Sequence, residues 1–422
     1  MPRLAFAAGD PFINYKNGRK ISMLTEEFIL REAQALENYL KKAYRHLHAH
    51  PEIAHEERET NLFIRDELDE MGVPYFAPAA NITIALLDSG LPGATVGIRC
   101  DTDALPVEEK TGVPYASQTP GKMHACGHDG HTALGLGVAK LLKKHAGEWQ
   151  GKVKIIFQPA EEGEGGADEV LATGLIHDVD VFFAIHLWSL WPTGTLHAAP
   201  VTVSAAVNMF KIRVVGKGGH GATPNLCADA LVAGAEMVSA LQTILSRRLS
   251  PMEPAVLTIG SFHAGSAGNI IAPEAELKGT IRALNEESRK LIEDTMAEMV
   301  QHIAALHHCT AEIENERISD AVQNDPRATH LARQCALKLV GAEKLGGQNT
   351  LMLGDDFSSY GRIAPYCYMQ LGVADEQKGT HYAHHNGRFA IDEDTLPLGV
   401  AWLTAASVLA GEKWLDSGID FS

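Results

Sequence analysis

The apolar positions in the first half of the chain switch between helical spacing and short continuous runs. Between residues 25 and 48 apolar residues recur every three or four positions, which predicts a helix with Thr25 as its N-cap. A second helix is predicted for about 130–145. Strands are predicted for four apolar runs, the last two nearly continuous as in strands buried on both faces: 82–87, 95–100, 153–157 and 179–187.

The pattern changes after about residue 203. Phe210, Ile212 and Val214 alternate with Lys211 and Arg213, which is typical of a strand with one face in water. The elements predicted within 204–318 follow the β-α-β-β-α-β order of the ferredoxin-like split unit. Within residues 319–422 the pattern predicts helices at 326–340 and 396–410 and a strand near 366–371. We therefore expect an α/β domain with a mostly parallel sheet flanked by helices (1–203 and 319–422), interrupted by a ferredoxin-like α+β domain (204–318).

The composition fits a soluble protein of two domains. The chain has 422 residues, more than one core usually holds, with 45% hydrophobic and 21% charged residues. A net charge of −17 would repel nucleic acid and anionic membranes, and no apolar run approaches membrane-spanning length. The six cysteines form no C-x-x-C pair, which disfavours a disulfide scaffold and favours a reducing cytoplasm. Neither nucleic acid nor a membrane is expected as a partner.

Metal-binding side chains gather in two segments. Residues 123–131 read Met-His-Ala-Cys-Gly-His-Asp-Gly-His, and thiolate with imidazole is a donor set that zinc-like ions prefer. The alternative is that Cys126 is an inert core thiol among surface histidines. Glu161 and Glu162 follow the strand at 153–157, where one carboxylate could bind metal while the other faces the bond to be attacked. An isolated acidic pair is more often a solvated loop.

Further polar residues follow or end the other predicted strands. Because the carboxyl ends of parallel strands meet at one edge of a sheet, we expect these residues to converge there with the two segments above. Of the two adjacent histidines near the chain end, only one can face a given site. The candidates are Asp101, Asp103, His186, His384 and His385.

Two other patterns are less favoured. His46 and His50 have the spacing of two ligands on one helical face, but the following proline pushes His50 out of the helix. Residues 216–221 match G-x-G-x-x-G, a dinucleotide fingerprint. Three residues, 222–224, separate its last glycine from the predicted helix, whereas that fingerprint opens a helix directly. A nucleotide-binding protein remains an alternative.

Taken together, these motifs resemble the M20 metallopeptidase family, in its branch of hippurate hydrolases, bacterial aminoacylases and plant auxin-conjugate hydrolases. The resemblance spans almost the whole chain, with matching segments at 45–48, 99–106, 123–131, 158–163, 218–222, 279–282 and 385–386. It implies Glu161 as the general base and Asp103 as a carboxylate behind the metal ligands. It also implies two divalent ions, Zn or Mn with Co or Ni as further candidates, held by Cys126, His128, Glu162, His186 and His385.

The inserted domain gains a role from the same resemblance. In the family it is a lid that also joins subunits, so a homodimer or homotetramer is expected. His220 is similar to the lid histidine that reaches the developing oxyanion, in some relatives from the partner subunit. Asn269 and Arg282 are similar to the residues that hold the carboxylate of the substrate. Gly387 departs from the proline of many relatives and could loosen the loop that carries His385.

The function implied is a metal-dependent amidohydrolase that cleaves N-acyl amino acids or related amide conjugates. A metallo-dipeptidase or carboxypeptidase of the same fold is the alternative within the hydrolases. A non-catalytic protein that binds small molecules is the alternative from a different class.

Overall fold

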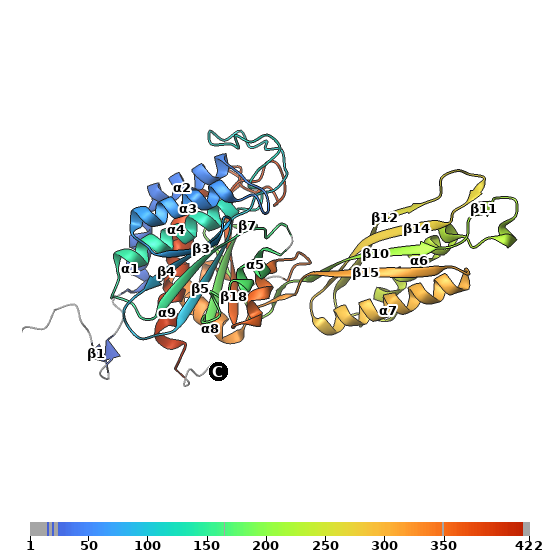
Figure 1. The fold of residues 1–422 in the computed structure, drawn as a ribbon. Helices are drawn as coiled ribbons and strands as arrows, with labels where there is room; N and C mark the ends of the chain where they lie inside the picture. Colours follow the sequence, from blue (N-terminus) through green and yellow to red (C-terminus); the bar gives the residue numbers. More distant parts are fainter. Residues whose placement is uncertain (1–14, 17–18, 21–23, 164, 348–349, 417–422) are drawn as a thin grey trace, which may run out of the picture. The chain divides into compact units, whose positions relative to one another are not determined.

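The computed structural model describes residues 15–16, 19–20, 24–163, 165–347 and 350–416 (Figure 1). Contacts divide the chain into unit 1, formed by Met1–Pro200, Asn324–Gln348 and Tyr360–Ser422, and unit 2, formed by Val201–Gln323 and Asn349–Ser359. The sequence assigns residues 349–359 to the first domain, yet Asn349–Ser359 groups with unit 2. The reason is backbone pairing, since Leu351 N–H donates to Val203 O at 2.9 Å and Leu351 O accepts from Ala205 N–H at 3.1 Å.

Unit 1 is built on an eight-stranded sheet with a parallel centre. Its strand order is β17-β8-β18-β7-β5-β6-β4-β3. The four central strands β18, β7, β5 and β6 pair in parallel, whereas β4 pairs antiparallel with β6 and β3 pairs antiparallel with β4. The strands are β3 Tyr75–Ala79, β4 Ile82–Asp88, β5 Thr95–Asp101, β6 Lys152–Gln158, β7 Val181–Pro192, β8 Leu196–His197, β17 Leu345–Gly346 and β18 Tyr366–Ala374. The predicted mostly parallel sheet is confirmed.

Helices cover this sheet, as Figure 1 shows. The predicted first helix is two helices, because Leu36 N–H donates to Ala33 O at 3.0 Å in a tight turn between them. Thr25 caps the first of the two, where its Oγ1 accepts from Phe28 N–H at 3.3 Å. The helices are α1 Glu26–Ala35, α2 Glu37–Ala49, α3 Arg58–Met71, α4 His128–Lys144, α5 Gly166–Ala172, α8 Pro326–Val340 and α9 Leu396–Lys413.

Helix α9 is a core helix of unit 1. Residues Glu393–Lys413 are long and apolar enough to cross a membrane by length and composition alone, contrary to the sequence expectation that no such run exists. Within the structure 83% of the window is buried, and α9 packs against α4 and against strands β5 and β7. Burial on all sides explains why this helix is apolar all round.

Unit 2 has the predicted β-α-β-β-α-β order. Its sheet runs β12-β14-β10-β15 with antiparallel neighbours. Phe210, Ile212 and Val214 are buried in its core, while Lys211 and Arg213 are not, as their alternation predicts. The elements are β10 Ala206–Val215, α6 Ala230–Arg247, β12 Ala255–Ala264, β14 Glu274–Ala283, α7 Glu286–Leu306 and β15 Thr310–Ser319.

Candidate metal centre

The carboxyl ends of three parallel strands place the candidate residues at one edge of the unit 1 sheet. Asp101 at the end of β5 lies opposite Gln158 at the end of β6. Asp103 and Glu161 follow these two strand ends within three residues. His186 lies in β7, which runs on to Pro192 instead of ending at residue 187 as the sequence predicts. The predicted convergence is therefore present.

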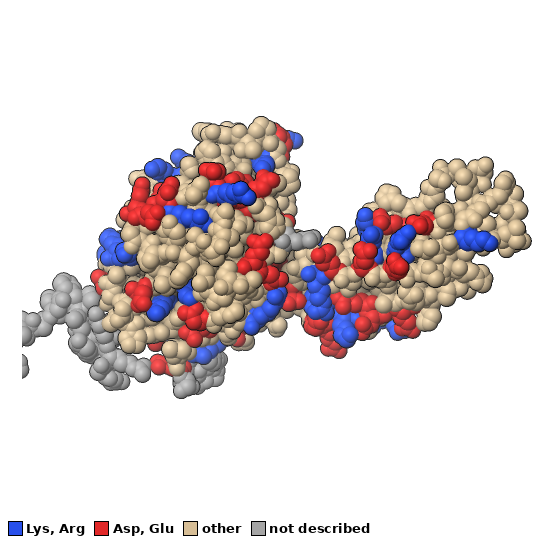
Figure 2. Space-filling model, viewed as in Figure 1, with Lys and Arg blue, Asp and Glu red and all other residues tan. Residues whose placement is uncertain are grey.

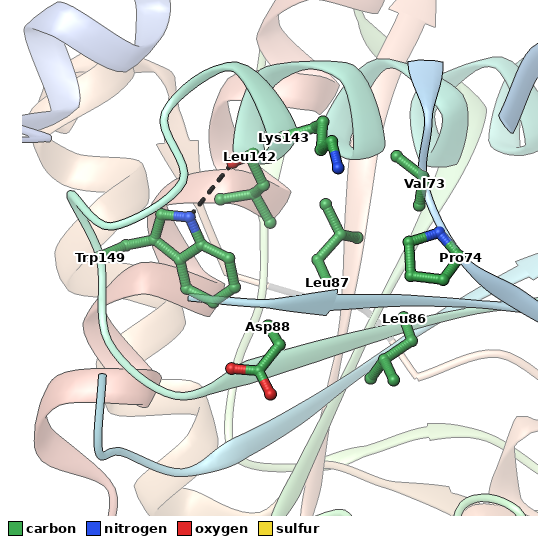
Figure 3. Close-up of a pocket in the computed structure, with 8 residues that line it drawn as sticks. All are labelled: Val73, Pro74, Leu86, Leu87, Asp88, Leu142, Lys143 and Trp149. Atoms are coloured by element: carbon green, nitrogen blue, oxygen red, sulfur yellow. Dashed lines mark hydrogen bonds between the residues drawn. The ribbon is translucent and has the colours of Figure 1, made fainter. Parts of the chain in front are cut away.

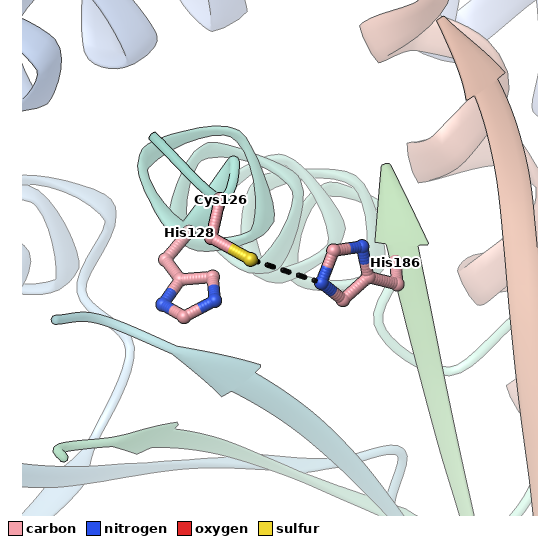
Figure 4. Close-up of side chains that lie close together, drawn as sticks. All are labelled: Cys126, His128 and His186. Atoms are coloured by element: carbon pink, nitrogen blue, oxygen red, sulfur yellow. Dashed lines mark hydrogen bonds between the residues drawn. The ribbon is translucent and has the colours of Figure 1, made fainter. Parts of the chain in front are cut away.

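Cys126, His128 and His186 face one another, as Figure 4 shows. Cys126 Sγ lies 3.6 Å from His186 Nε2, and the donor atoms of all three side chains lie within 4.8 Å of one another. His128 Nδ1 lies 2.9 Å from the backbone oxygen of Asp103, and His186 Nδ1 lies 2.9 Å from that of Leu187. Since a carbonyl can only accept, each Nδ1 carries a proton, which leaves each Nε2 as the ring nitrogen that could bind a metal ion.

Two glutamates and a further histidine extend this set. His385 Nε2 lies 2.9 Å from Glu162 Oε1, and Cys126, Glu162 and His385 again have donor atoms within 4.8 Å. His128, Glu161 and Glu162 form a third such group. Because these groups share Cys126, His128 and Glu162, the five predicted ligands form one continuous cluster with Glu161 beside it.

The electrostatics of the cluster suit cations. Burial and the charges of Glu162 and Glu161 raise the pKa of the Cys126 thiol well above its usual range. Burial alone would lower the pKa of His128, but nearby Asp101 and Asp103 raise it to about 10. His128 Nε2 is buried and lacks a hydrogen-bond partner among the described residues. A thiol, imidazoles and carboxylates with this excess of negative charge fit divalent ions, which would favour the deprotonated forms.

Other histidines near the cluster are already engaged. His131 Nε2 accepts from Leu187 N–H at 2.9 Å while its Nδ1 donates to Asp101 Oδ1 at 2.5 Å. His384 Nε2 donates to Leu187 O at 2.9 Å, so of the two adjacent histidines only His385 faces Glu162. Asp101 therefore supports His131, and Asp103, through its backbone oxygen, supports His128.

Asp103 also holds the loop that carries the two glutamates. Its Oδ1 accepts from Glu161 N–H at 3.1 Å and its Oδ2 accepts from Glu162 N–H at 2.8 Å. Sequence reasoning missed a second such carboxylate, Glu57, whose Oε1 accepts from Ala160 N–H at 2.7 Å. Glu57 stands among several glutamates at 52–59, and nothing in that pattern distinguishes the buried one.

His46 and His50 do not form a metal site. Helix α2 ends at Ala49, and His50 Nδ1 donates to His46 O at 2.7 Å while the His46 ring stacks on Phe63. The buried histidine of this segment is His48, whose Nδ1 lies 2.6 Å from Asp129 Oδ2 and whose Nε2 lies 3.2 Å from Glu109 Oε1.

Gly387 tightens its loop, contrary to the expectation that it would loosen it. Lys110 N–H donates to Gly387 O, at 2.5 Å. A Cβ at Gly387 would lie 2.3 Å from Glu108 O, so the close approach of two backbones requires glycine here. The segment that carries His385 is therefore packed against 108–110.

The glycine-rich segment of unit 2 is not a dinucleotide site. Helix α6 begins only at Ala230, where Asp229 caps it, well beyond Gly221. Lys217 instead pairs with Ala228 through backbone hydrogen bonds of 2.8 and 3.0 Å. The glycine turn thus closes on a loop and opens no helix.

The predicted catalytic histidine and the two predicted substrate-binding residues of unit 2 fall into two places. His220 in β11 (Gly219–His220) pairs with β13 (Ile270–Ile271), and Asn269 O accepts from Gly221 N–H at 2.8 Å. Arg282 lies near the other end of β14, where it donates to Met352 O at 2.9 Å. Arg282 lies eight residue steps along β14 from Glu274, a distance of about 26 Å. Within one copy, unit 2 therefore brings His220 and Asn269 together but keeps Arg282 apart from them.

A separate hollow of about 160 Å³ lies at the opposite edge of the unit 1 sheet (Figure 3). Asp88 there pairs with Lys152, which begins β6, so this is the edge where the parallel strands start. Trp149 Nε1 donates to Leu142 O at 3.2 Å in its wall. Its lining is mostly apolar: Val73, Pro74, Leu86, Leu87, Asp88, Leu142, Lys143 and Trp149.

Comparison with known protein families identifies the family to which this chain belongs. The model of the peptidase family M20/M25/M40 matches residues 97–407. The chain belongs to the M20 peptidase family. The match includes most of β5 and all members of the cluster described above, from the 123–131 segment and the two glutamates to His186 and His385.

Other M20 proteins are similar over most of the chain. The N-acyl-L-amino acid amidohydrolase of Geobacillus stearothermophilus is 39% identical over 291 residues, 68% of this chain and 79% of the relative. Thermostable carboxypeptidase 1 of Saccharolobus solfataricus is 34% identical over 379 residues, 88% and 95% of the two chains. The solved structure of the Bacillus subtilis YXEP protein, described as a dinuclear metal binding peptidase from the M20 family, is 31% identical with a TM-score of 0.79, covering 90% and 99%.

These relatives confirm the predicted family and reaction class. This M20 chain is a hydrolase that acts on amide bonds. The α/β fold with a large, mainly parallel sheet is likewise that of the solved M20 relative.

Proposed function

We propose that this M20 chain releases the amino acid from an N-acyl amino acid, with two divalent ions held by Cys126, His128, Glu162, His186 and His385. The observation that carries the proposal is the adjacency of Glu161 and Glu162. Glu162 belongs to the cluster with His385, while Glu161 Oε2 lies 3.9 Å from His128 Nε2 and its side chain keeps 11% exposure. Glu162 therefore takes the role of metal ligand in this proposal, and Glu161, beside the cluster, takes that of proton transfer.

When bound, the ions would supply Lewis acidity that polarises the amide carbonyl and favours ionisation of the attacking water. Glu161 takes the proton of that water and then delivers it to the leaving amine, so that the carboxylate is restored. Asp103 holds Glu161 and Glu162 in place through their backbone amides. Thiolate and imidazole favour Zn²⁺ and carboxylates admit Mn²⁺, so these two are the proposed metals, ahead of Co²⁺ and Ni²⁺.

The choice of an N-acyl amino acid rests on the Geobacillus relative, whose name states that substrate class. The carboxypeptidase relative supports the second candidate, a peptide substrate cleaved beside its C-terminal residue. Both substrates end in a carboxylate, for which Arg282 is the proposed partner through paired hydrogen bonds. The six cysteines are all free, which supports a reducing compartment such as the cytoplasm as the proposed location.

We further propose that a second copy of the chain completes each site with His220 and Asn269. Support comes from unit 2, where these two residues and Arg282 lie too far apart to meet one carboxylate. Exposed apolar side chains accompany His220 and Asn269, and few charged side chains are visible at that end in Figure 2. The exposed apolar side chains are Leu226 at 64% exposure, Ile270 at 49%, Val232 at 46% and Leu231 at 40%.

Mixing two inactive variants tests this sharing of residues. In a dimer assembled from Glu161→Gln and His220→Ala chains, one of the two sites would be intact if His220 acts on the partner's substrate. Random exchange should then restore about a quarter of wild-type activity. Failure to restore activity after subunits have demonstrably exchanged would show that His220 serves its own chain or neither.

The base is tested by Glu161→Gln, which preserves shape but cannot carry the proton. It should retain both metals by elemental analysis while amine release falls at least about a hundredfold. Glu169→Gln is the matched control, because Glu169 is exposed on α5 and pairs only loosely with His55, at 3.4 Å. Undiminished turnover in Glu161→Gln would remove Glu161 from the reaction.

A further inference from the structure

Three successive backbone N–H groups in unit 1 donate hydrogen bonds to two buried carboxylates. Ala160 N–H donates to Glu57 Oε1 at 2.7 Å, Glu161 N–H to Asp103 Oδ1 at 3.1 Å, and Glu162 N–H to Asp103 Oδ2 at 2.8 Å. Glu57 is 0% exposed and Asp103 is 1% exposed. Three consecutive hydrogen bonds to two buried side chains restrain the direction of the whole 160–162 segment.

The backbone at Ala160 needs such a restraint. Its φ of 51° lies in the left-handed region, which residues other than glycine rarely adopt. The segment has little freedom to relax elsewhere, because a Cβ at Gly166 would lie 1.9 Å from Pro159 O and one at Gly163 would lie 2.6 Å from Ala54 Cβ. Strain of this kind persists where the surroundings hold it, and it is common at functional sites.

Glu57 is itself anchored from several directions. It precedes α3, and its backbone oxygen accepts from Asn61 Nδ2 at 2.8 Å. Upstream, Glu52 accepts from Thr60 N–H at 2.8 Å, and Ile53 forms a parallel bridge with Ala104, next to Asp103. The two carboxylates that hold 160–162 are therefore tied to each other through neighbouring backbone.

We propose that Glu57 is a positioning residue, which restrains the left-handed Ala160 and, together with Asp103, aims the side chains of Glu161 and Glu162. The inference rests on the proposed role of Glu161 and adds a residue outside the metal-binding motifs. Burial, with a further contribution from Asp103, raises the pKa of Glu57 to about 7. A protonated or amidated side chain still offers a carbonyl oxygen to Ala160 N–H, so Gln should substitute for Glu.

The test compares Glu57→Ala, Glu57→Gln and the control Glu56→Gln, whose carboxylate forms a surface ion pair with Lys122. In Glu57→Ala, kcat should fall about 10- to 100-fold with KM within about twofold, and metal affinity by chelator competition should weaken because Glu162 shares the loop. Glu57→Gln should regain most of both. Wild-type kcat and metal affinity in folded Glu57→Ala would overturn the proposal, as would a Gln variant as poor as Ala.

A second comparison isolates the strain at Ala160. Glycine adopts this φ freely, so in an Ala160→Gly background the loss caused by Glu57→Ala should shrink markedly. Fully additive losses would contradict the mechanism. If Glu57→Ala does not fold, Glu57→Asp, one methylene too short to reach, takes its place in both comparisons. Should the wild type release no amine, the proposed function fails, but the metal-affinity arm still decides the role of Glu57.

Discussion

Replacing Asp103 by Asn should weaken metal binding and turnover together. The carboxylate accepts from Glu161 N–H at 3.1 Å on Oδ1 and from Glu162 N–H at 2.8 Å on Oδ2. Its Oδ1 also lies 3.2 Å from His128 Nδ1, whose proton it shares with the Asp103 backbone oxygen. Asn keeps the shape but has only one accepting oxygen. Whichever way its amide turns, the NH2 group must face at least one backbone N–H.

The less costly orientation points the NH2 group at Glu162 N–H and keeps the two bonds on the other oxygen. A buried donor left without a partner costs about 1–3 kcal/mol. Because Glu162 is a proposed ligand, about 5- to 150-fold weaker metal binding is expected, with a fall in kcat that persists at saturating metal since Glu161 shares the loop.

Competition with a chromophoric chelator measures the affinity, and amine release at saturating metal gives kcat. Asp325→Asn is the matched control, because Asp325 Oδ1 also accepts a backbone N–H, from Ala328 at 2.8 Å, where α8 begins. Affinity and kcat within twofold of wild type in a folded Asp103→Asn variant would refute the reasoning.

Three other changes have defined outcomes. Cys126→Ala should lower bound metal per chain, and full occupancy by elemental analysis would remove the thiol from the ligand set. Gly387→Ala should destabilise the chain by about 1–3 kcal/mol and weaken metal binding, since its Cβ would lie 2.3 Å from Glu108 O, whereas Gly347→Ala, with no atom within 4 Å, should do neither. Burial alone would lower the pKa of His48, but hydrogen bonds to Asp129 and Glu109 raise it to about 9. The resulting stability, up to about 3 kcal/mol, is complete below pH about 6.5 and disappears as pH rises through 9, so urea unfolding of the wild type should lose more stability than His48→Gln across that window.

The parallel centre of unit 1 could be predicted from the sequence because buried strands leave continuous apolar runs. The same logic placed Asp103, Glu161 and His186 at one edge of the sheet, since parallel strands end together. The motif at 123–131 supplies two members of the cluster, Cys126 and His128, but its spacing alone does not show which of its three histidines binds metal. The family resemblance implied His128 as the ligand, and the hydrogen bonds of His131 to Leu187 and Asp101 give the physical reason why His131 is not one.

Other features depended on contacts that no local pattern encodes. Glu57 resembles its exposed neighbour Glu56 in sequence, yet one is buried against Ala160 and the other pairs with Lys122 at the surface. The assignment of 349–359 to unit 2 follows from backbone pairing of Leu351 across the chain. Asn269 and Arg282 are far apart because the strand β14 extends from Glu274 to Ala283 between the two positions, and the sequence alone does not place the strand ends in space.

Metal-dependent release of a free amine is the central claim. Purified protein would be offered N-acetyl, N-benzoyl and longer N-acyl amino acids beside dipeptides, with and without chelator and added Zn²⁺, Mn²⁺ or Co²⁺. The account predicts amine release from N-acyl amino acids that chelator abolishes and added metal restores. Release that survives complete metal removal, or no release from any of these substrates after reconstitution, would contradict it.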